Sequence, residues 1–288
     1  MIRIATRGSA LARWQAEHVA ALLGGAELVI VDTAGDRDKT TPLDDLGGRG
    51  IFVKEVQAAV LDGRADIAVH SAKDLPAAPE MAPPGLVIGA VPQRADARDA
   101  LVGSTLAGIP PGGLVATGSA RRRALLADLR PDLTFTDLRG NIDTRLAKAP
   151  SFAAIVVAYA ALVRLGLEDR ATEVLDAAVF VPQVAQGALA VECRVGEEAA
   201  VIAIDDAPSR SAVESERAWL AAIGGGCDLP VAARAVVDGE DVVLTAVLAS
   251  PDGRIVLRDT ATGRDPIGVG SALAEQMLRR GGRWLLDS

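Results

Sequence analysis

Residues 2–23, IRIATRGSALARWQAEHVAALL, indicate the fold class at the start of the chain. The apolar run from Ile2 to Ala5 predicts a strand, and Thr6-Arg7-Gly8-Ser9 is a polar turn. From Ala10 to Leu23 the apolar residues recur at helical spacing. A strand, a polar turn and a helix in this order are typical of an α/β protein.

The same rhythm recurs further along the chain. A first series has strands predicted at Glu27–Val31, Ala65–Val69 and Leu86–Val91, and a helix over Ile51–Leu61. A second series has strands predicted at Leu114–Ala116, Leu133–Thr136 and Ala154–Val157, with helices that start at Ser119 and Asn141. Two similar α/β units are therefore expected.

The C-terminal part has a different pattern. A helix predicted from Ser209 leads to the loop that holds Cys227. Strand-like runs follow at Val231–Val237, Asp241–Leu248 and Arg254–Asp259, and a helix is predicted from about Gly268 to Arg280. This order predicts a three-stranded antiparallel meander closed by a helix, which is an α+β unit.

Composition and charge exclude several classes of protein. The 288 residues suit two or three domains, and the aromatic content of 3% favours α/β over an aromatic-rich sandwich. The net charge of −8 argues against a nucleic-acid partner. We find neither an export signal nor a stretch long and apolar enough to cross a membrane, so a cytoplasmic protein is expected. Two cysteines and two scattered histidines predict neither a disulfide nor a metal site.

Four turns combine cations with glycine or small hydroxyl residues: TRGS (6–9), HSAKD (70–74), ATGSARRR (116–123) and LRGNIDTR (138–145). Backbone N–H groups at a helix start and the fork of an arginine bind carboxylates or phosphates. One such turn is weak evidence, but four together predict a site for several anions. A kinase-like phosphate loop is disfavoured because the Gly-x-x-x-x-Gly-Lys-Ser/Thr pattern is absent.

Two further residues could carry chemistry. Cys227 follows three glycines, which leave room for a large group at the sulfur, but an isolated cysteine in such a loop is more often a small buried residue in a tight turn. Asp74 lies in a cationic turn after an apolar strand. It could balance a developing positive charge or carry a proton, or simply belong to a surface turn. Taken singly, both residues leave these alternatives open.

Longer motifs carry a resemblance to a known family: RIATR (3–7), GGRGIFVKE (47–55), ADIAVHSAKD (65–74), LRGN (138–141), QVAQGA (183–188) and GGC (225–227) with Pro230. In this order and over nearly the whole chain, they resemble the hydroxymethylbilane synthase family, also called porphobilinogen deaminase, of tetrapyrrole and heme biosynthesis. The resemblance implies a monomeric transferase whose small-molecule substrate is porphobilinogen. Cys227 would hold a dipyrromethane cofactor through a thioether. Four porphobilinogen units would be added with release of ammonia, and the linear tetrapyrrole would then be released by hydrolysis.

The resemblance also implies a domain organisation. Two domains of the type II periplasmic-binding-protein kind would surround a cleft, the first formed by 1–92 with 187–204 and the second by 93–186. A third domain, 205–288, would carry the cysteine. Gln183 to Gly187 would be one of the segments that return the chain to the first domain.

Site residues follow from the same resemblance. Asp74 would be catalytic, because a fixed carboxylate stabilises the azafulvene-type cation left when ammonia departs. Besides Cys227, the cofactor-binding residues would be Lys73, Asp74, Thr117, Ser119, Arg121, Arg122, Arg139 and Gly140. The substrate-binding residues would be Arg7, Ser9, Arg49, Arg145, Arg164 and Gln186.

Three positions depart from the family pattern. Arg49 stands where lysine is common and is a weaker candidate, while Asp45 and Gly118, where a lysine and a second serine are usual, receive no role. Two competing functions have less support. A non-catalytic anion-binding module usually carries an export signal, and a cysteine hydrolase needs a histidine paired with Cys227.

Overall fold

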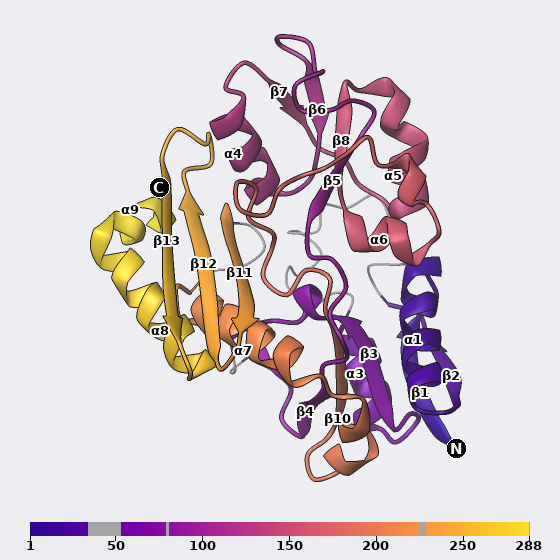
Figure 1. The fold of residues 1–288 in the computed structure, drawn as a ribbon. Helices are drawn as coiled ribbons and strands as arrows, with labels where there is room; N and C mark the ends of the chain where they lie inside the picture. Colours follow the sequence, from indigo (N-terminus) through magenta and orange to yellow (C-terminus); the bar gives the residue numbers. More distant parts are fainter. Residues whose placement is uncertain (34–52, 79–80, 225–228, 288) are drawn as a thin grey trace. The chain divides into compact units, whose positions relative to one another are not determined.

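The computed structural model describes residues 1–33, 53–78, 81–224 and 229–287 (Figure 1). Contacts between residues divide the chain into two compact units. The first unit is Met1–Ala95 with Gly187–Arg210, and the second is Asp96–Gln186 with Ser211–Ser288. Within the described residues, no helix is long and apolar enough to cross a membrane.

The first unit is built on a five-stranded sheet of order β2-β1-β3-β10-β4. Strand β1 runs parallel to β2 and β3, whereas β10 is antiparallel to β3 and β4. The elements are β1 (Ile2–Arg7), α1 (Ala10–Leu22), β2 (Ala26–Val31), α3 (Lys54–Leu61), β3 (Ile67–Ser71), β4 (Leu86–Ala90) and β10 (Leu189–Arg194). One turn of 3-10 helix, Ala72–Asp74, follows β3 directly.

Both faces of this sheet are covered, which explains the nearly continuous apolar runs of β1 and β3. Ile4 and Ile67 pair across the strands and pack on one face with α1 residues such as Val19. Their neighbours Ala5 and Ala68 point to the opposite face and pack with α3. Successive side chains on a strand alternate between faces, so one short apolar run supplies two cores.

The second unit repeats this arrangement with the sheet order β7-β6-β8-β5-β9. Strand β6 is parallel to β7 and β8, and β5 is antiparallel to β8 and β9. In both sheets, three parallel strands are thus followed by one antiparallel strand and an edge strand. The elements are β5 (Asp99–Val102), β6 (Leu114–Ala116), α4 (Ala120–Leu129), β7 (Thr134–Thr136), α5 (Ile142–Lys148), β8 (Ala154–Ala158), α6 (Tyr159–Arg164) and β9 (Glu173–Val174).

The C-terminal part forms an antiparallel meander of order β11-β12-β13 with helices α7, α8 and α9. Helix α8 packs on β13 and β12 (Figure 1). It approaches α7 so closely that a Cβ on Gly270 would lie 2.3 Å from the Ser215 carbonyl oxygen. The bounds are α7 (Ala207–Ala222), β11 (Val231–Asp238), β12 (Asp241–Ala249), β13 (Val256–Gly263), α8 (Pro266–Met277) and α9 (Arg283–Asp287).

The expected fold class is therefore confirmed: two similar α/β sheets are followed by a smaller α+β part. The meander shares an apolar cluster with the second sheet, because Ala232 and Val247 pack with Leu125 of α4. These contacts place 96–186 and 211–288 in one compact unit. Strands β5, β9 and β10 and helix α6 were absent from the expected series.

Candidate active site

The turn after β1 places a cation beside the start of a helix. Arg7 is the last residue of β1, and Ser9 is the N-cap of α1, where its hydroxyl oxygen accepts a hydrogen bond from the Ala12 N–H (3.3 Å). The Thr6 hydroxyl donates to the Ala12 carbonyl (3.1 Å), which ties the turn to the helix. The N–H groups of a first helical turn favour an anion, so Arg7 and α1 attract the same kind of group.

The turn after β3 carries the predicted catalytic carboxylate. The buried Ala72 N–H donates to the Ala188 carbonyl (3.0 Å), which anchors the 3-10 turn, while Asp74 is exposed and Lys73 half-buried. Asp74 and Arg7 line the same pocket, of about 30 Å³. This volume holds roughly one or two water molecules, so the pocket marks where the side chains converge and is not a complete substrate site.

Two polar residues that the motifs left without a role also line this pocket. Gln15 is 4% exposed, and its Nε2 has no hydrogen-bond partner among the described residues. Buried His70 has its Nε2 3.0 Å from Oε2 of buried Glu192, and Gln57 Nε2 donates to both oxygens of Glu192 (3.1 and 2.9 Å). A signal for Gln15 was present, since it lies one turn from Leu11 on the inner side of α1.

In the second unit, the start of α4 gathers four predicted cofactor-binding residues. Ser119 is the N-cap, and its hydroxyl oxygen accepts from the Arg122 N–H (3.4 Å). The buried Thr117 side chain accepts from the Ser119 N–H (3.2 Å). Arg121 and Arg122 lie in the first turn and are also buried, at 2% and 6% exposed.

Both arginines share one carboxylate, that of Asp99 at the start of β5, which is fully buried. Arg121 Nη2 lies 2.8 Å from Asp99 Oδ2, and Arg122 Nε and Nη2 lie 3.0 and 2.7 Å from Oδ1. Burial by itself would raise the pKa of Asp99, but the two guanidinium groups outweigh it and lower this pKa to about 2. Burial also lowers the pKa of Arg121, and the nearby Asp99 opposes that shift.

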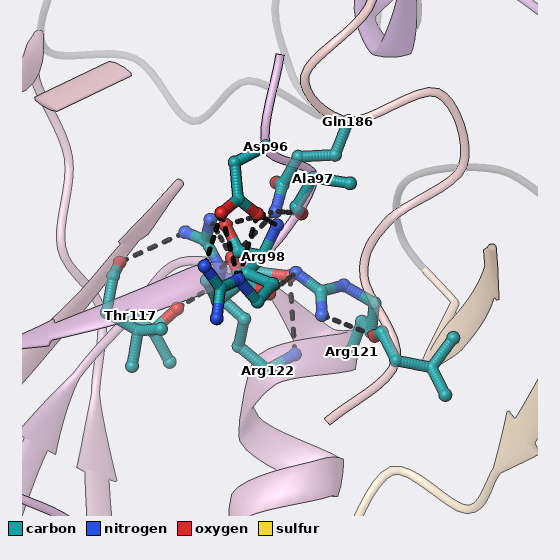
Figure 2. Close-up of polar contacts among 11 residues, drawn as sticks. Asp96, Ala97, Arg98, Thr117, Arg121, Arg122 and Gln186 are labelled. Atoms are coloured by element: carbon teal, nitrogen blue, oxygen red, sulfur yellow. Dashed lines mark hydrogen bonds and ion pairs between the residues drawn. The ribbon is translucent and has the colours of Figure 1, made fainter. Parts of the chain in front are cut away.

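Gln186 belongs to the same cluster, which Figure 2 shows. Its Nε2 donates to the Ala97 carbonyl (2.7 Å) and to Asp99 Oδ1 (3.0 Å), and its side chain is fully buried. The motif predicted a donor to the substrate. In the structure this amide donates to the main chain and to Asp99.

A third capped turn starts α5. Asn141 is the N-cap and accepts from the Thr144 N–H (2.9 Å) and the Thr144 hydroxyl (2.8 Å), while Arg145 Nε donates to the Gly140 carbonyl (2.8 Å). Gly140 has φ 113°, and a Cβ there would lie 2.7 Å from Thr144 Cγ2, so glycine is required. Arg139 is exposed beside this turn.

The remaining predicted residues are more scattered. Arg164 ends α6 and is buried, and burial lowers its pKa to about 10. Cys227 and Arg49 lie outside the described residues. The helix and strand predicted on either side of Cys227 are confirmed, as α7 ends at Ala222 and β11 begins at Val231. In the described part of the chain, no three His, Cys, Asp or Glu residues are grouped to hold a metal ion.

The predicted site residues thus fall into groups on separate elements. The first unit holds Arg7, Ser9 and Asp74, and Arg7 and Asp74 line one pocket there. The second unit holds the cluster at α4, the turn at α5 and Arg164. Each of these turns presents cations or backbone N–H groups, which suit a carboxylate ligand.

Comparison with known proteins gives a consistent result. A family model described as "Porphobilinogen deaminase, dipyromethane cofactor binding domain" matches residues 2–201, and one described as "Porphobilinogen deaminase, C-terminal domain" matches residues 211–279.

Curated relatives named porphobilinogen deaminase match over nearly their whole length. The protein from Roseiflexus castenholzii is 44% identical over 99% of this chain and 98% of its own. The protein from Acidothermus cellulolyticus is 45% identical over 100% of this chain and 92% of its own.

A solved periplasmic sulfonate-binding protein, SsuA from Methylobacillus flagellatus KT, shares 13% identity over 75% of this chain and 66% of its own. Its TM-score of 0.39 is too low to support an inference. The matches of the two family models and of the full-length relatives show that the chain belongs to the porphobilinogen deaminase family.

Proposed function

We propose that this protein is a hydroxymethylbilane synthase. It joins four porphobilinogen molecules head to tail, forms one carbon–carbon bond and releases one ammonia at each addition, and then releases the linear tetrapyrrole by hydrolysis. Beside the family membership, the observation that carries this proposal is the pocket that Arg7 and Asp74 line together.

Arg7 and Asp74 have opposite tasks in this proposal. Porphobilinogen carries an acetate and a propionate side chain, and Arg7 beside the start of α1 binds one of these carboxylates. Departure of ammonia leaves positive charge on the pyrrole. Asp74, on the 3-10 turn anchored through Ala72, stabilises that charge as it develops. Lys73 adds a cation in the turn after β3. Ser9 caps the start of α1 after β1, at the same edge of the sheet.

The second unit fits the carboxylates of the dipyrromethane cofactor. Two arginines face one aspartate, so the cluster at α4 keeps one positive charge in excess. Arg121 Nε is buried and has no hydrogen-bond partner among the described residues. A surplus charge and an unused buried donor suit an incoming carboxylate. Thr117 and Ser119 add hydroxyl groups at this helix start.

The turn at α5 offers a more exposed grip. Arg139 is exposed to solvent, and Gly140 is an exposed glycine whose missing side chain leaves its backbone accessible. We assign Arg139 and Gly140 to the cofactor and Arg145 and Arg164 to the growing product. When bound on Cys227, the cofactor supplies the pyrrole carbon to which the first porphobilinogen is joined.

Three further parts of the proposal concern the molecule as a whole. We propose that residues 205–288 act as a separate cofactor-bearing domain, that the enzyme is a monomer and that it works in the cytoplasm. The free thiol of Cys193 suits a reducing compartment. Sedimentation of the purified protein and fractionation of cells test the last two.

The reaction is tested by following porphobilinogen and ammonia together. The purified chain is expected to consume porphobilinogen and to release ammonia in equal amounts, with a tetrapyrrole as product. Binding of porphobilinogen without release of ammonia would contradict the proposal and favour a non-catalytic anion-binding module.

A further inference from the structure

Asp99 has a position that no motif predicted. It begins β5, a strand that the sequence pattern did not reveal, and its carboxylate is fully buried against two arginines of α4. A buried ion pair replaced by apolar residues of similar volume is often as stable or more so. Stability alone is therefore a weak reason for this cluster.

Hydrogen bonds fix the orientation of the Arg121 and Arg122 guanidinium groups. Arg121 Nη1 donates to the Val181 carbonyl (2.9 Å), and Arg122 Nη1 donates to the Val156 carbonyl (3.0 Å). Asp99 holds the other side of each guanidinium group, with Oδ2 on Arg121 and Oδ1 on Arg122. Arg121 also lies over the Phe180 ring, 5.6 Å from its centre. With each guanidinium group held by Asp99 and a main-chain carbonyl, the direction of its remaining donors is set in advance.

Gln186 holds Asp99 in turn. Its amide bridges the Ala97 carbonyl and Asp99 Oδ1, so the carboxylate is tied to the main chain just before β5. The Nε2 group of Gln186 makes its hydrogen bonds to groups inside the protein, and the side chain is 0% exposed. A direct contact with substrate would require these hydrogen bonds to break.

We propose that Asp99 is a positioning residue that orients Arg121 and Arg122 for a carboxylate of the cofactor, and that Gln186 acts through Asp99 without touching the substrate. This inference rests on the proposed function, since it takes the arginine pair as cofactor-binding. Asp99 balances one of the two positive charges. It leaves a single preoriented charge for one external carboxylate.

The test measures the rate at which apo-protein gains the mass of dipyrromethane on Cys227 during incubation with porphobilinogen. Gln186→Leu is the main variant, because it removes the amide at similar size. Asp99→Asn and the double variant complete a cycle. Asp96→Asn is the matched control. Asp96 lies three residues before Asp99, and its partly exposed carboxylate pairs with Arg98. The folded fraction of each variant is measured by urea unfolding, so loading is compared at equal amounts of folded protein.

Loading is expected to slow about tenfold or more in Gln186→Leu and in Asp99→Asn, since hydrogen bonds to charged groups are lost or misdirected. The control should load as the wild type does. The gain in thermal stability on loading should shrink in the same two variants, because fewer favourable contacts reach the cofactor. The double variant should be no slower than Asp99→Asn alone.

Other outcomes separate the claims. If the wild type gains no dipyrromethane, the proposed function fails and this inference loses its basis. If the wild type loads and folded Gln186→Leu loads equally fast, the positioning role is wrong. If the effects of the two single variants multiply in the double variant, Gln186 acts independently of Asp99. If Asp99→Asn does not fold, the loading rate of Gln186→Leu decides the result.

Discussion

Arg7, at the end of β1, and Asp74, in the turn after β3, line one pocket although they come from different turns of the first unit. The parallel pairing of β1 with β3 explains this meeting, because parallel strands end at the same edge of the sheet. Cation and carboxylate are thereby presented to a single ligand.

Replacement of Asp74 by asparagine is expected to leave folding and cofactor attachment intact and to lower kcat by about a hundredfold or more. The amide cannot stabilise the positive charge that ammonia leaves behind. Steady-state kinetics with the loaded enzyme measure the effect. Asp62→Asn, which changes an exposed carboxylate in the same unit, should keep normal turnover. Near-normal turnover of Asp74→Asn would remove Asp74 from the catalytic role.

Gln15→Leu should raise KM for porphobilinogen by about tenfold or more. Gln15 lines the pocket, and its Nε2 has no hydrogen-bond partner in the part of the chain that the structure describes, so a hydrogen bond from it to a substrate carboxylate would be lost. Gln276→Leu alters an exposed glutamine on α8 and should leave KM unchanged. Equal KM values in the two variants would show that Gln15 only fills space.

Acid should weaken the fold through Asp99. The pKa of Asp99 is about 2 in the folded protein, below its ordinary value of 3.8. A carboxyl whose pKa is depressed by folding stabilises the protein above its ordinary pKa, and that contribution is lost as pH falls from about 4 to about 2. The loss amounts to about 2 kcal/mol. Urea unfolding at a series of pH values should show that the free energy of unfolding falls with acid in the wild type and falls less in Asp99→Asn. Identical declines in both proteins would contradict the role of Asp99 in acid sensitivity.

Gly140→Ala should destabilise the second unit more than Gly112→Ala does. Both glycines have positive φ, so each alanine costs about 1–2 kcal/mol in backbone strain. At Gly112 nothing lies within 4 Å of the new Cβ, whereas at Gly140 it would collide with Thr144. The collision adds about 1–3 kcal/mol. Thermal unfolding of both variants measures the difference. Equal losses of stability would mean that Thr144 moves aside at no cost.

Much of the fold could be predicted because periodicity is local. The strand, turn and helix of residues 2–23 appear as expected, with α1 over Ala10–Leu22, and the meander after the Cys227 loop is confirmed. Strand β5 was missed because it starts with a charged residue, Asp99. That charge is tolerated in a buried strand because two arginines from α4 balance it, a long-range fact that no local pattern contains.

The candidate site shows the same limit. The motifs identified Arg121, Arg122 and Gln186 as polar residues of interest, and they do lie together. The motifs could not reveal that these side chains contact Asp99, because those contacts depend on how β5 pairs with β8. Gln15 was not singled out, and His70, although it belongs to a quoted motif, received no role, since their pocket forms only when α1 packs on the sheet.

The most direct test of the account is the intact mass of the purified, denatured protein beside that of Cys227→Ala. We predict that the wild type carries the additional mass of one dipyrromethane and that the variant does not. A wild-type chain that is unmodified, and that stays unmodified after incubation with porphobilinogen, would contradict the proposed function and make Cys227 a structural thiol.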